Sequence, residues 1–267
     1  MKLNSALRSR KSLGPLLSAA AIAVSTPAIA EEGAAETPFV TGTLSLMVDT
    51  HFISYGQDVW AAGNSWRDPL FHPSIELNFN FGNGFKGILG TWWDVNDNAD
   101  SSIGNAIQEV DVWLGVGYAY ENWSFTALYQ EWLYANQSER ILDFKVAYAH
   151  WLNPSLTLHA RVDGAEPFDE GLVTVLGIAP GKTFEDLANL TVSIPVNVSF
   201  DTDNYHGGDA GFGFASVGVA ASVPLAFMPG SWSLNAGVTL YHTNDEVIPG
   251  NPDETFVTGS MGVALAF

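Results

Sequence analysis

The 267-residue sequence contains no cysteine and few basic residues. The absence of cysteine excludes disulfide bonds, thiolate nucleophiles and cysteine-ligated zinc or iron–sulfur sites. Ten Lys and Arg residues against 29 Asp and Glu residues give a formal charge of −19. Because nucleic-acid binding needs a basic surface for the phosphates, this charge argues against nucleic acid as a partner. Charged residues make up only 15% of the chain and apolar residues 47%, which is too hydrophobic for an acidic disordered protein.

The N-terminus has the three-part pattern of a secretory signal peptide. Four basic residues, Lys2, Arg8, Arg10 and Lys11, precede an apolar run over residues 13–24, and a small-residue cleavage pattern ends at Ala30. The apolar run is shorter than the roughly 20 residues of a membrane-spanning helix. We therefore expect residues 1–30 to be removed after export and residues 31–39 to form a short periplasmic segment. The mature chain would carry 29 acidic and six basic residues, a formal charge of −23.

After residue 30 the sequence lacks long apolar runs and instead alternates between apolar and polar residues. Between residues 71 and 81, Phe, Pro, Ile and Leu occupy the odd positions, while His, Ser, Glu and Asn occupy the even ones. A period of two is typical of a β-strand with one apolar and one polar face. About twelve segments show it, most of them near the 9–11 residues of a tilted membrane strand: 40–53, 71–81, 85–95, 108–120, 123–133, 141–152, 156–163, 172–179, 190–200, 213–227, 232–242 and 255–267.

The connections between these segments alternate in length. The short ones are 82–84, 121–122, 153–155 and 228–230, and the long ones are 54–70, 96–107, 134–140, 164–171, 201–212 and 243–254. Short turns on one side and long loops on the other are typical of outer-membrane barrels and favour that fold over a secreted β-sandwich. Lipid cannot hydrogen-bond an open sheet edge, so membrane-spanning strands must close into a barrel. We therefore predict an all-β fold over residues 40–267, a closed antiparallel transmembrane β-barrel of about 12 strands in an up-and-down meander. The ten residues 180–189 do not fit this scheme, because they are too many for a short turn.

Aromatic residues cluster near the ends of the expected strands, as they do in membrane girdles. Those beside the short turns are Phe85, Trp123, Phe227, Trp232 and Phe267, and those at the opposite ends are Phe71, Trp93, Tyr129, Phe144 and Phe200. We therefore expect a location in the cell outer membrane, with membrane lipid as one partner.

Two parts of the sequence resemble known proteins. The last strand alternates apolar residues from Val257 and ends in the aromatic Phe267, which resembles the C-terminal assembly signal of Gram-negative outer-membrane proteins. This resemblance implies the barrel-assembly machinery as a partner. Residues 40–150 resemble the TorF-type porin family, through the stretches 49–56, 72–75, 84–92 and 109–115. The family has an aromatic–Arg–Gly sequence near the first loop, where this chain has Ser54-Tyr55-Gly56 and no Arg. Membership would imply a small porin without catalytic residues.

The polar faces of neighbouring strands would bring acidic and histidine side chains to the outer mouth of the barrel. These candidate site residues are Asp49, His51, His72, Glu76, Asp94, Glu109 and Asp111. Rings of carboxylates select cations in pores, so we expect a weak, salt-sensitive cation preference. The alternative is that the carboxylates only solvate the lumen and keep neighbouring proteins apart.

Two more specific hypotheses concern the same lumen. Asp49, His51, His72 and Glu76 combine imidazole and carboxylate groups, which suit a divalent metal if they meet in one coordination sphere. Ordinary hydrogen bonding in the lumen is the simpler interpretation, and we predict no metal or other cofactor. The inward Trp92, Trp113 and Trp132 could form a stacking track for a sugar or nucleoside, or they could simply fill a narrow barrel.

The sequence thus predicts a porin-like channel for passive diffusion of small solutes. A structural or adhesive barrel with a filled lumen is the alternative, since twelve strands lie between filled and open barrel sizes. An outer-membrane hydrolase is a further possibility. His242 with Asp245 and His206 with Asp209 lie near loops, but no serine motif accompanies either pair, so we expect no enzyme.

Overall fold

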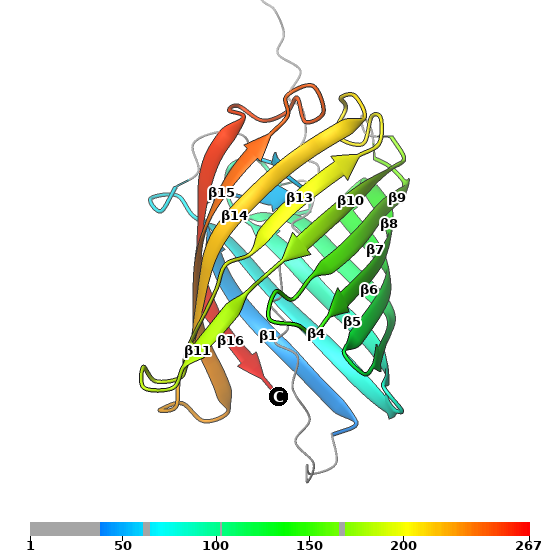
Figure 1. Cartoon of the computed structure of the whole chain (residues 1–267). Coiled ribbons are helices and arrows are strands. Elements are labelled where there is room, and N and C mark those ends of the chain that lie inside the picture. The colour runs from blue at the N-terminus through cyan, green and yellow to red at the C-terminus, as the bar shows by residue number, and fades with distance from the viewer. Residues whose placement is uncertain (1–37, 61–64, 102, 166–168) are drawn as a thin grey trace, which may run out of the picture.

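The computed structural model describes residues 38–60, 65–101, 103–165 and 169–267. The expected signal peptide and most of the expected periplasmic segment lie outside these ranges. The described chain forms a closed barrel (Figure 1). Its first strand, β1 (Val40–Asp49), pairs antiparallel with β4 (Leu70–Gly82) on one side and with the last strand, β16 (Thr255–Ala266), on the other. This pairing closes the sheet and confirms the predicted antiparallel barrel of about twelve strands.

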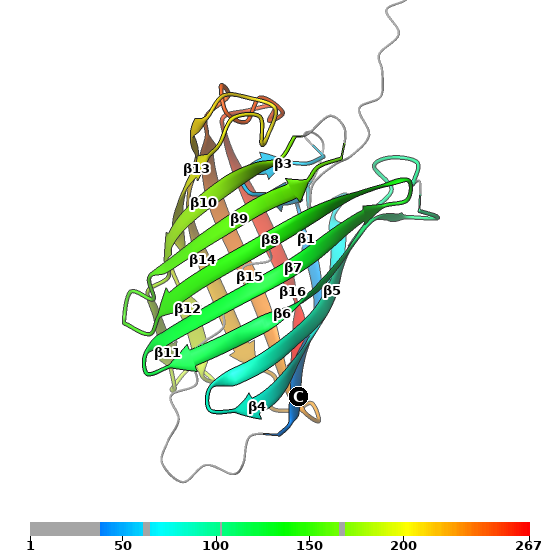
Figure 2. The same ribbon diagram turned by 90° about the vertical axis from the view of Figure 1, so that its right-hand side faces the viewer.

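Neighbouring strands between β4 and β16 follow the chain as a meander, tilted against the barrel axis (Figure 2). The remaining wall strands are β5 (Phe85–Val95), β6 (Ile107–Tyr120), β7 (Trp123–Tyr134), β8 (Gln137–Tyr148), β9 (Ser155–Asp163), β10 (Gly171–Ile178), β13 (Val196–Asp201), β14 (Gly211–Pro224) and β15 (Ser231–Thr243).

One hairpin extends past the rim on the short-turn side and explains the segment 180–189. Strand β11 (Gly181–Phe184) continues β10 after Pro180, and β12 (Leu190–Ser193) precedes β13, with Pro195 between them. Each proline lacks a backbone N–H and interrupts the strand, although the chain keeps its direction. The connecting turn is therefore only residues 185–189, not the ten residues expected from the sequence.

Cross-strand pairing fixes which side chains face outward. Leu114, Val116, Val219 and Val238 lie on the outer face and are 54–60% exposed. Their sequence neighbours point into the barrel, as the period of two requires. An apolar outer band on a closed sheet is the architecture of transmembrane β-barrels.

The aromatic residues of the short-turn rim form continuous contacts on this outer face. Phe85 stacks on Tyr118 with ring centroids 4.4 Å apart, and Trp123 packs against Tyr148 at 4.7 Å. These positions fit one of the two girdles expected from the sequence.

Two of the sequence-based boundaries were wrong. The first strand was expected to reach residue 53, but β1 ends at Asp49, and a small hairpin of β2 (Ile53–Ser54) and β3 (Gln57–Asp58) follows. The segment 134–140 was expected to be a long loop, but β7 and β8 are joined by residues 135–136 alone. Ala135 has φ 54° there, in the left-handed region that a tight turn needs. Polar residues on the inward face of β8 resemble a loop in sequence, which is why the strand was missed.

None of the described residues belongs to a helix that is long and apolar enough to cross a membrane.

Candidate functional site in the barrel lumen

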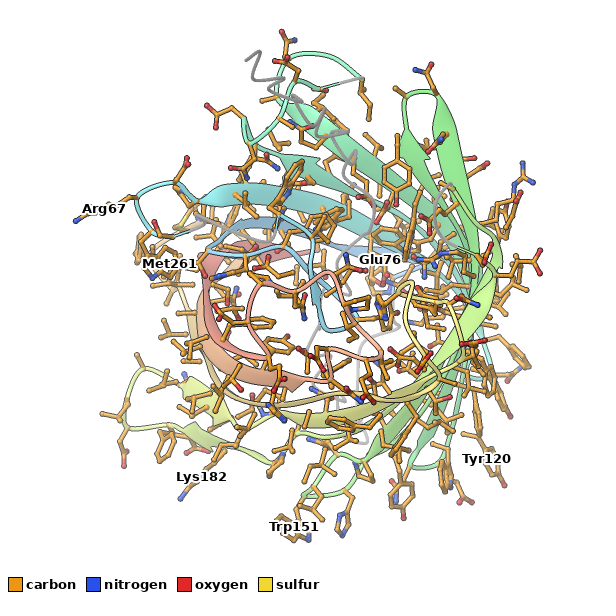
Figure 3. The ribbon with its side chains drawn as sticks, turned by 90° about the horizontal axis from the view of Figure 1, so that it is seen from above. Arg67, Glu76, Tyr120, Trp151, Lys182 and Met261 are labelled. Atoms are coloured by element: carbon orange, nitrogen blue, oxygen red, sulfur yellow. The ribbon has the colours of Figure 1, made fainter. Side chains whose placement is uncertain are left out.

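The outer end of the lumen is filled by loops that fold inward. Phe52 and Tyr55, from the first loop, are 1% and 8% exposed. Tyr55 stacks on His159 of β9 with ring centroids 3.8 Å apart, and Phe52 packs on Trp92 of β5 at 5.1 Å. Viewed from above, the β2–β3 hairpin and the loops 202–210 and 244–254 lie across the barrel opening (Figure 3). We call these three inward segments, with the lumen side chains that they cover, the outer cap.

A single side chain joins two segments of the outer cap. The Asn251 carboxamide accepts a hydrogen bond from the Asp58 backbone N–H at 2.7 Å and donates to the Gly56 carbonyl at 2.9 Å. The same Nδ2 atom lies 3.1 Å from Thr243 Oγ1 at the end of β15. Asn251 therefore ties the hairpin to the last outer loop, almost 200 residues away in the sequence.

Gly56 permits close packing beneath this link. Its φ is +95°, and a Cβ atom there would lie 2.5 Å from the Phe214 ring. The hairpin turn therefore requires glycine both for its backbone conformation and for space.

One group of predicted mouth residues forms a hydrogen-bonded chain. His72 Nδ1 lies 2.7 Å from Asp49 Oδ2, and His72 Nε2 lies 3.2 Å from Asp94 Oδ1. Asp94 is 0% exposed and also accepts hydrogen bonds from the Trp60 indole and the Asn96 amide, at 3.0 and 2.8 Å. With three hydrogen-bond partners around it, this buried carboxylate is satisfied, as buried charges must be.

Glu109 and Asp111 continue the acidic group across β6 and are each 3% exposed. Asp94 pairs in register with Glu109, so their side chains are cross-strand neighbours on the inward face. Asp49, His72, Asp94, Glu109 and Asp111 therefore lie near one another at the outer end of the lumen, beneath the outer cap and not in open water. Alternation along strands determines which side chains face inward, but it does not indicate the direction in which a loop folds.

Glu76 and His51 lie apart from this group. Glu76 sits near the middle of β4 and accepts hydrogen bonds from the Trp113 indole at 3.3 Å and the Asn78 amide at 3.2 Å. His51, after the end of β1, lies 3.9 Å from the Asp58 carboxylate. In the described part of the chain, no three His, Asp or Glu side chains are placed to hold a metal ion. The four candidate ligands Asp49, His51, His72 and Glu76 thus do not share one coordination sphere.

A second buried ionic group was not identified from the sequence. Arg161 of β9 donates from Nε to the Glu139 carboxylate of β8 at 2.5 Å, and both side chains are 0% exposed. Arg161 also donates to the Tyr205 carbonyl at 2.7 Å, and its guanidinium lies 4.0 Å from the centre of the Tyr205 ring. Arg161 therefore holds loop 202–210 in the lumen. Glu139 lay in a segment expected to be a loop, so its inward position could not be recognised.

His159 and Asp143 were also missed, although both lie on polar faces of predicted strands. His159 Nδ1 is 2.6 Å from Asp143 Oδ1, and Gln130 donates to the other carboxylate oxygen at 2.6 Å. Only the register between β8 and β9 could have identified this contact, because Asp143 and His159 are direct cross-strand partners. Pairing register is not visible in the sequence of one strand alone.

Burial shifts the pKa values of four side chains in or beside the cap loops toward the neutral form. Desolvation raises the pKa of Tyr55 well above its usual value, and the nearby Asp143 carboxylate raises it further. Desolvation also raises the pKa of Tyr205 and lowers the pKa of His206, although Asp201 accepts a hydrogen bond from this histidine at 3.0 Å. At the half-buried His51, desolvation again lowers the pKa. Neutral forms of Tyr55, Tyr205, His206 and His51 are compatible with dense packing in the barrel mouth.

The three inward tryptophans have different surroundings. Trp92 and Trp132 are 4% and 2% exposed and belong to the packed outer cap. Trp113 is half-buried and lies against Gly90, where a Cβ atom would come within 2.4 Å of the indole. Only Trp113 therefore keeps part of its surface toward the open part of the lumen, so the three rings do not form a continuous stacking track.

The inner half of the lumen is polar and less tightly filled. Its walls carry small inward residues, namely Gly115, Gly117, Ala119, Gly218, Ala220 and Ser222. Ser124 and Lys145 face inward in register with these rows and are nevertheless exposed. Solvent-accessible space therefore lies between the short-turn rim and the outer cap.

No protein-family model and no curated protein matches the chain, so its similarity to the TorF-type family remains a resemblance. Several solved outer-membrane proteins are similar in fold. The NanC porin is 9% identical over 83% of this chain and 98% of that protein, with a TM-score of 0.48. Outer membrane phospholipase A from Escherichia coli is 12% identical over 84% and 92%, with a TM-score of 0.43. OmpF of Salmonella typhi, in complex with daunomycin, is 10% identical over 85% and 97%, with a TM-score of 0.41. At these values the similarity is one of general barrel shape and supports no further conclusion about function.

Proposed function

We propose that the protein is a porin-like outer-membrane channel for passive diffusion of small solutes, closed at its outer end in the described state. The observation that supports this most directly is the division of the lumen. A polar, solvent-accessible inner half ends against an outer cap whose covering segments come from the loops, not from the wall strands. Loops can move without opening the sheet, so the barrel can be stable whether or not its mouth is open.

We further propose a weak cation preference. If the cap loops move away from the wall, Asp94, Glu109 and Asp111 line the path that the loops close in the described state. These carboxylates belong to strands β5 and β6 and would stay in place. Carboxylate rings favour cations, and the effect falls off over a Debye length of about 8 Å at physiological salt.

A structural or adhesive barrel is the second candidate, and the packing of the outer cap favours it. Tyr205 and Ile248, from two different loops, are both 0% exposed in the lumen. If this packing never loosens, the protein conducts nothing.

We infer no catalytic function. His206 contacts Asp201 and not Asp209, and the side chains of His206 and Asp201 are both fully buried. His242 lies 2.9 Å from the Thr255 hydroxyl on the outer face. Neither arrangement supports an accessible nucleophile beside a base.

The test is planar-bilayer conductance of the refolded protein in asymmetric KCl. We expect small, infrequent channel steps whose reversal potential indicates cation preference. The triple variant Asp94→Asn, Glu109→Gln, Asp111→Asn should shift the reversal potential toward zero, because it removes the carboxylates from the path.

Glu185→Gln with Asp186→Asn is the matched control, because these acids lie in an exposed turn at the opposite rim. The control should keep the wild-type reversal potential. Absence of any steps would support the filled, structural barrel. An anion-preferring wild type, or a triple variant with unchanged selectivity, would contradict the carboxylate mechanism.

A further inference from the structure

The inner half of the lumen carries two lysines in one row of the barrel wall. Lys86 of β5 pairs with Gly117 of β6, Gly117 pairs with Thr126 of β7, and Thr126 pairs with Lys145 of β8. Paired residues on neighbouring strands share a face, so both lysines point into the lumen from one row of paired residues. Their Cα atoms are three strand spacings apart, about 14 Å along the sheet. Two extended lysine side chains can cover most of that distance.

The wall between the lysines is shaped to let one side chain reach toward the other. A Cβ atom at Gly117 would lie 2.9 Å from Lys86 Cγ and 2.7 Å from Lys86 Cε. The Lys86 stem therefore lies flat over Gly117 and extends across β6 in the direction of Lys145. A larger residue at position 117 would displace this stem.

Neither ammonium group is held by a salt bridge or a hydrogen bond from the described residues. In the described part of the chain, neither Lys86 nor Lys145 makes an ion pair within 4.0 Å or a hydrogen bond. The carboxylates of Glu76 and Asp143 are close enough to Lys145 to interact electrostatically. Both carboxylates already accept two hydrogen bonds from other side chains, Glu76 from Trp113 and Asn78, and Asp143 from Gln130 and His159.

Charge along the lumen is therefore segregated. The inward acids Asp94, Glu109, Asp111 and Glu139 lie at the outer end, and Glu76 and Asp143 lie near the middle. Toward the short-turn rim, the inward faces of the described wall strands carry Lys86 and Lys145 and no acid. This acidic protein thus places Lys86 and Lys145 together toward the inner end of its lumen.

We propose that Lys86 and Lys145 form an anion-binding site in the inner lumen, together with the hydroxyl of Thr126 between them. The ligand class is a small oxyanion such as a carboxylate or a phosphate, which can accept charge-assisted hydrogen bonds from two ammonium groups at once. Thr157 of β9, which pairs with Lys145, adds a second hydroxyl to the same row. An anion bound there would also relieve the repulsion between the two lysines.

This site deepens the proposed channel function, because it gives the inner half a selectivity opposite to that of the outer mouth. Cations would concentrate at the outer end and anions at the inner end. Such an axial asymmetry of fixed charge favours solutes that carry both signs over simple cations.

The test is calorimetric titration of the detergent-solubilised protein with inorganic phosphate at neutral pH and low salt. We expect saturable binding by the wild type and a loss of affinity of at least about tenfold in Lys86→Gln/Lys145→Gln, because two charge-assisted hydrogen bonds are removed. Gly117→Ala should weaken binding while both lysines remain, because it pushes the flexible Lys86 stem off the wall.

Lys182→Gln is the matched control. It removes the same charge from an exposed side chain of β11 that lies outside the barrel ring (Figure 3), over the Phe184 ring. This variant should bind phosphate like the wild type. Absence of binding by the wild type, unchanged affinity in the double variant, or an equal loss in Lys182→Gln would each overturn the site.

Binding in detergent does not depend on conduction, so the two proposals can fail separately. If the protein binds phosphate through these lysines but shows no channel steps, the anion site is supported and the channel function is contradicted. If the protein conducts but its double variant binds phosphate as tightly as the wild type, the channel function is supported and the anion site is contradicted.

Discussion

At the scale of single residues, Arg161 brings a buried positive charge into the acidic outer lumen. It compensates Glu139 in a site from which water is excluded and holds the backbone of loop 202–210 through Tyr205. Removing one partner of a buried ion pair typically costs about 3–5 kcal/mol, because the other charge stays buried without compensation. Arg161→Met should therefore lower the free energy of unfolding by about that amount.

The measurement is urea unfolding of the folded barrel in lipid vesicles, followed by tryptophan fluorescence. The double variant Glu139→Gln/Arg161→Met should recover part of the loss, because it leaves no buried charge. A double variant no more stable than Arg161→Met would show that Arg161 acts through the loop carbonyl and not through Glu139.

The strand pattern of the sequence was sufficient to find some of the charged groups in the lumen. Asp94, Glu109 and Asp111 were recognised because they alternate with apolar residues on well-patterned strands. Glu139 and Tyr205 were not, because their neighbours resemble loop residues and their burial depends on contacts with distant strands. The sequence therefore predicted which charges face the lumen wherever the strand pattern was strong, and it could not predict what covers them.

At the scale of elements, we expect the β2–β3 hairpin to control whether the lumen is open. Its turn is tied to loop 244–254 by Asn251, which makes two hydrogen bonds to the hairpin backbone. Asn251→Ala removes both, at a typical cost of about 0.5–1.5 kcal/mol for each hydrogen bond. A hairpin held by fewer contacts should leave the lumen more often, so the variant should raise the fraction of time spent in the conducting state.

Single-channel recordings of the wild type and Asn251→Ala test this expectation. Asn244→Ala is the control, because its side chain caps the backbone N–H of Glu246 within the same loop and does not reach the hairpin. An open fraction unchanged in Asn251→Ala, or raised equally in both variants, would count against the hairpin as the moving element.

The elements themselves show how far periodicity can predict a barrel. Strands were found because each must alternate when one face meets lipid and the other meets the lumen. The first strand was expected to reach residue 53 because Phe52 continues the alternation after the chain has left the wall. The opposite error occurred after Pro180, where β11 continues the direction of β10 in residues that were assigned to a connection.

At the scale of the whole molecule, an excess of acid is arranged along one axis. The outer end holds buried carboxylates, most of them paired through histidine, arginine or amide groups. The inner end holds two lysines that make no salt bridge with the described residues, and the outer face is almost free of charge along the apolar band. Composition gave the sign of the net charge, but only the closed register of the strands shows that the two signs are separated.

The apolar band itself can be tested with one pair of variants on β15. Val238 faces outward and is 56% exposed, while Asn235, three residues earlier, faces the lumen in register with Gly262. An arginine on the lipid face near the membrane midplane costs roughly 2–4 kcal/mol, whereas lumen positions tolerate charge. Val238→Arg should therefore lower the free energy of unfolding in lipid vesicles by about that amount, and Asn235→Arg should lower it much less. In detergent micelles, which deform around a charge, the difference between the two variants should shrink. Equal losses for both variants in vesicles would mean that the outer face of β15 does not contact lipid.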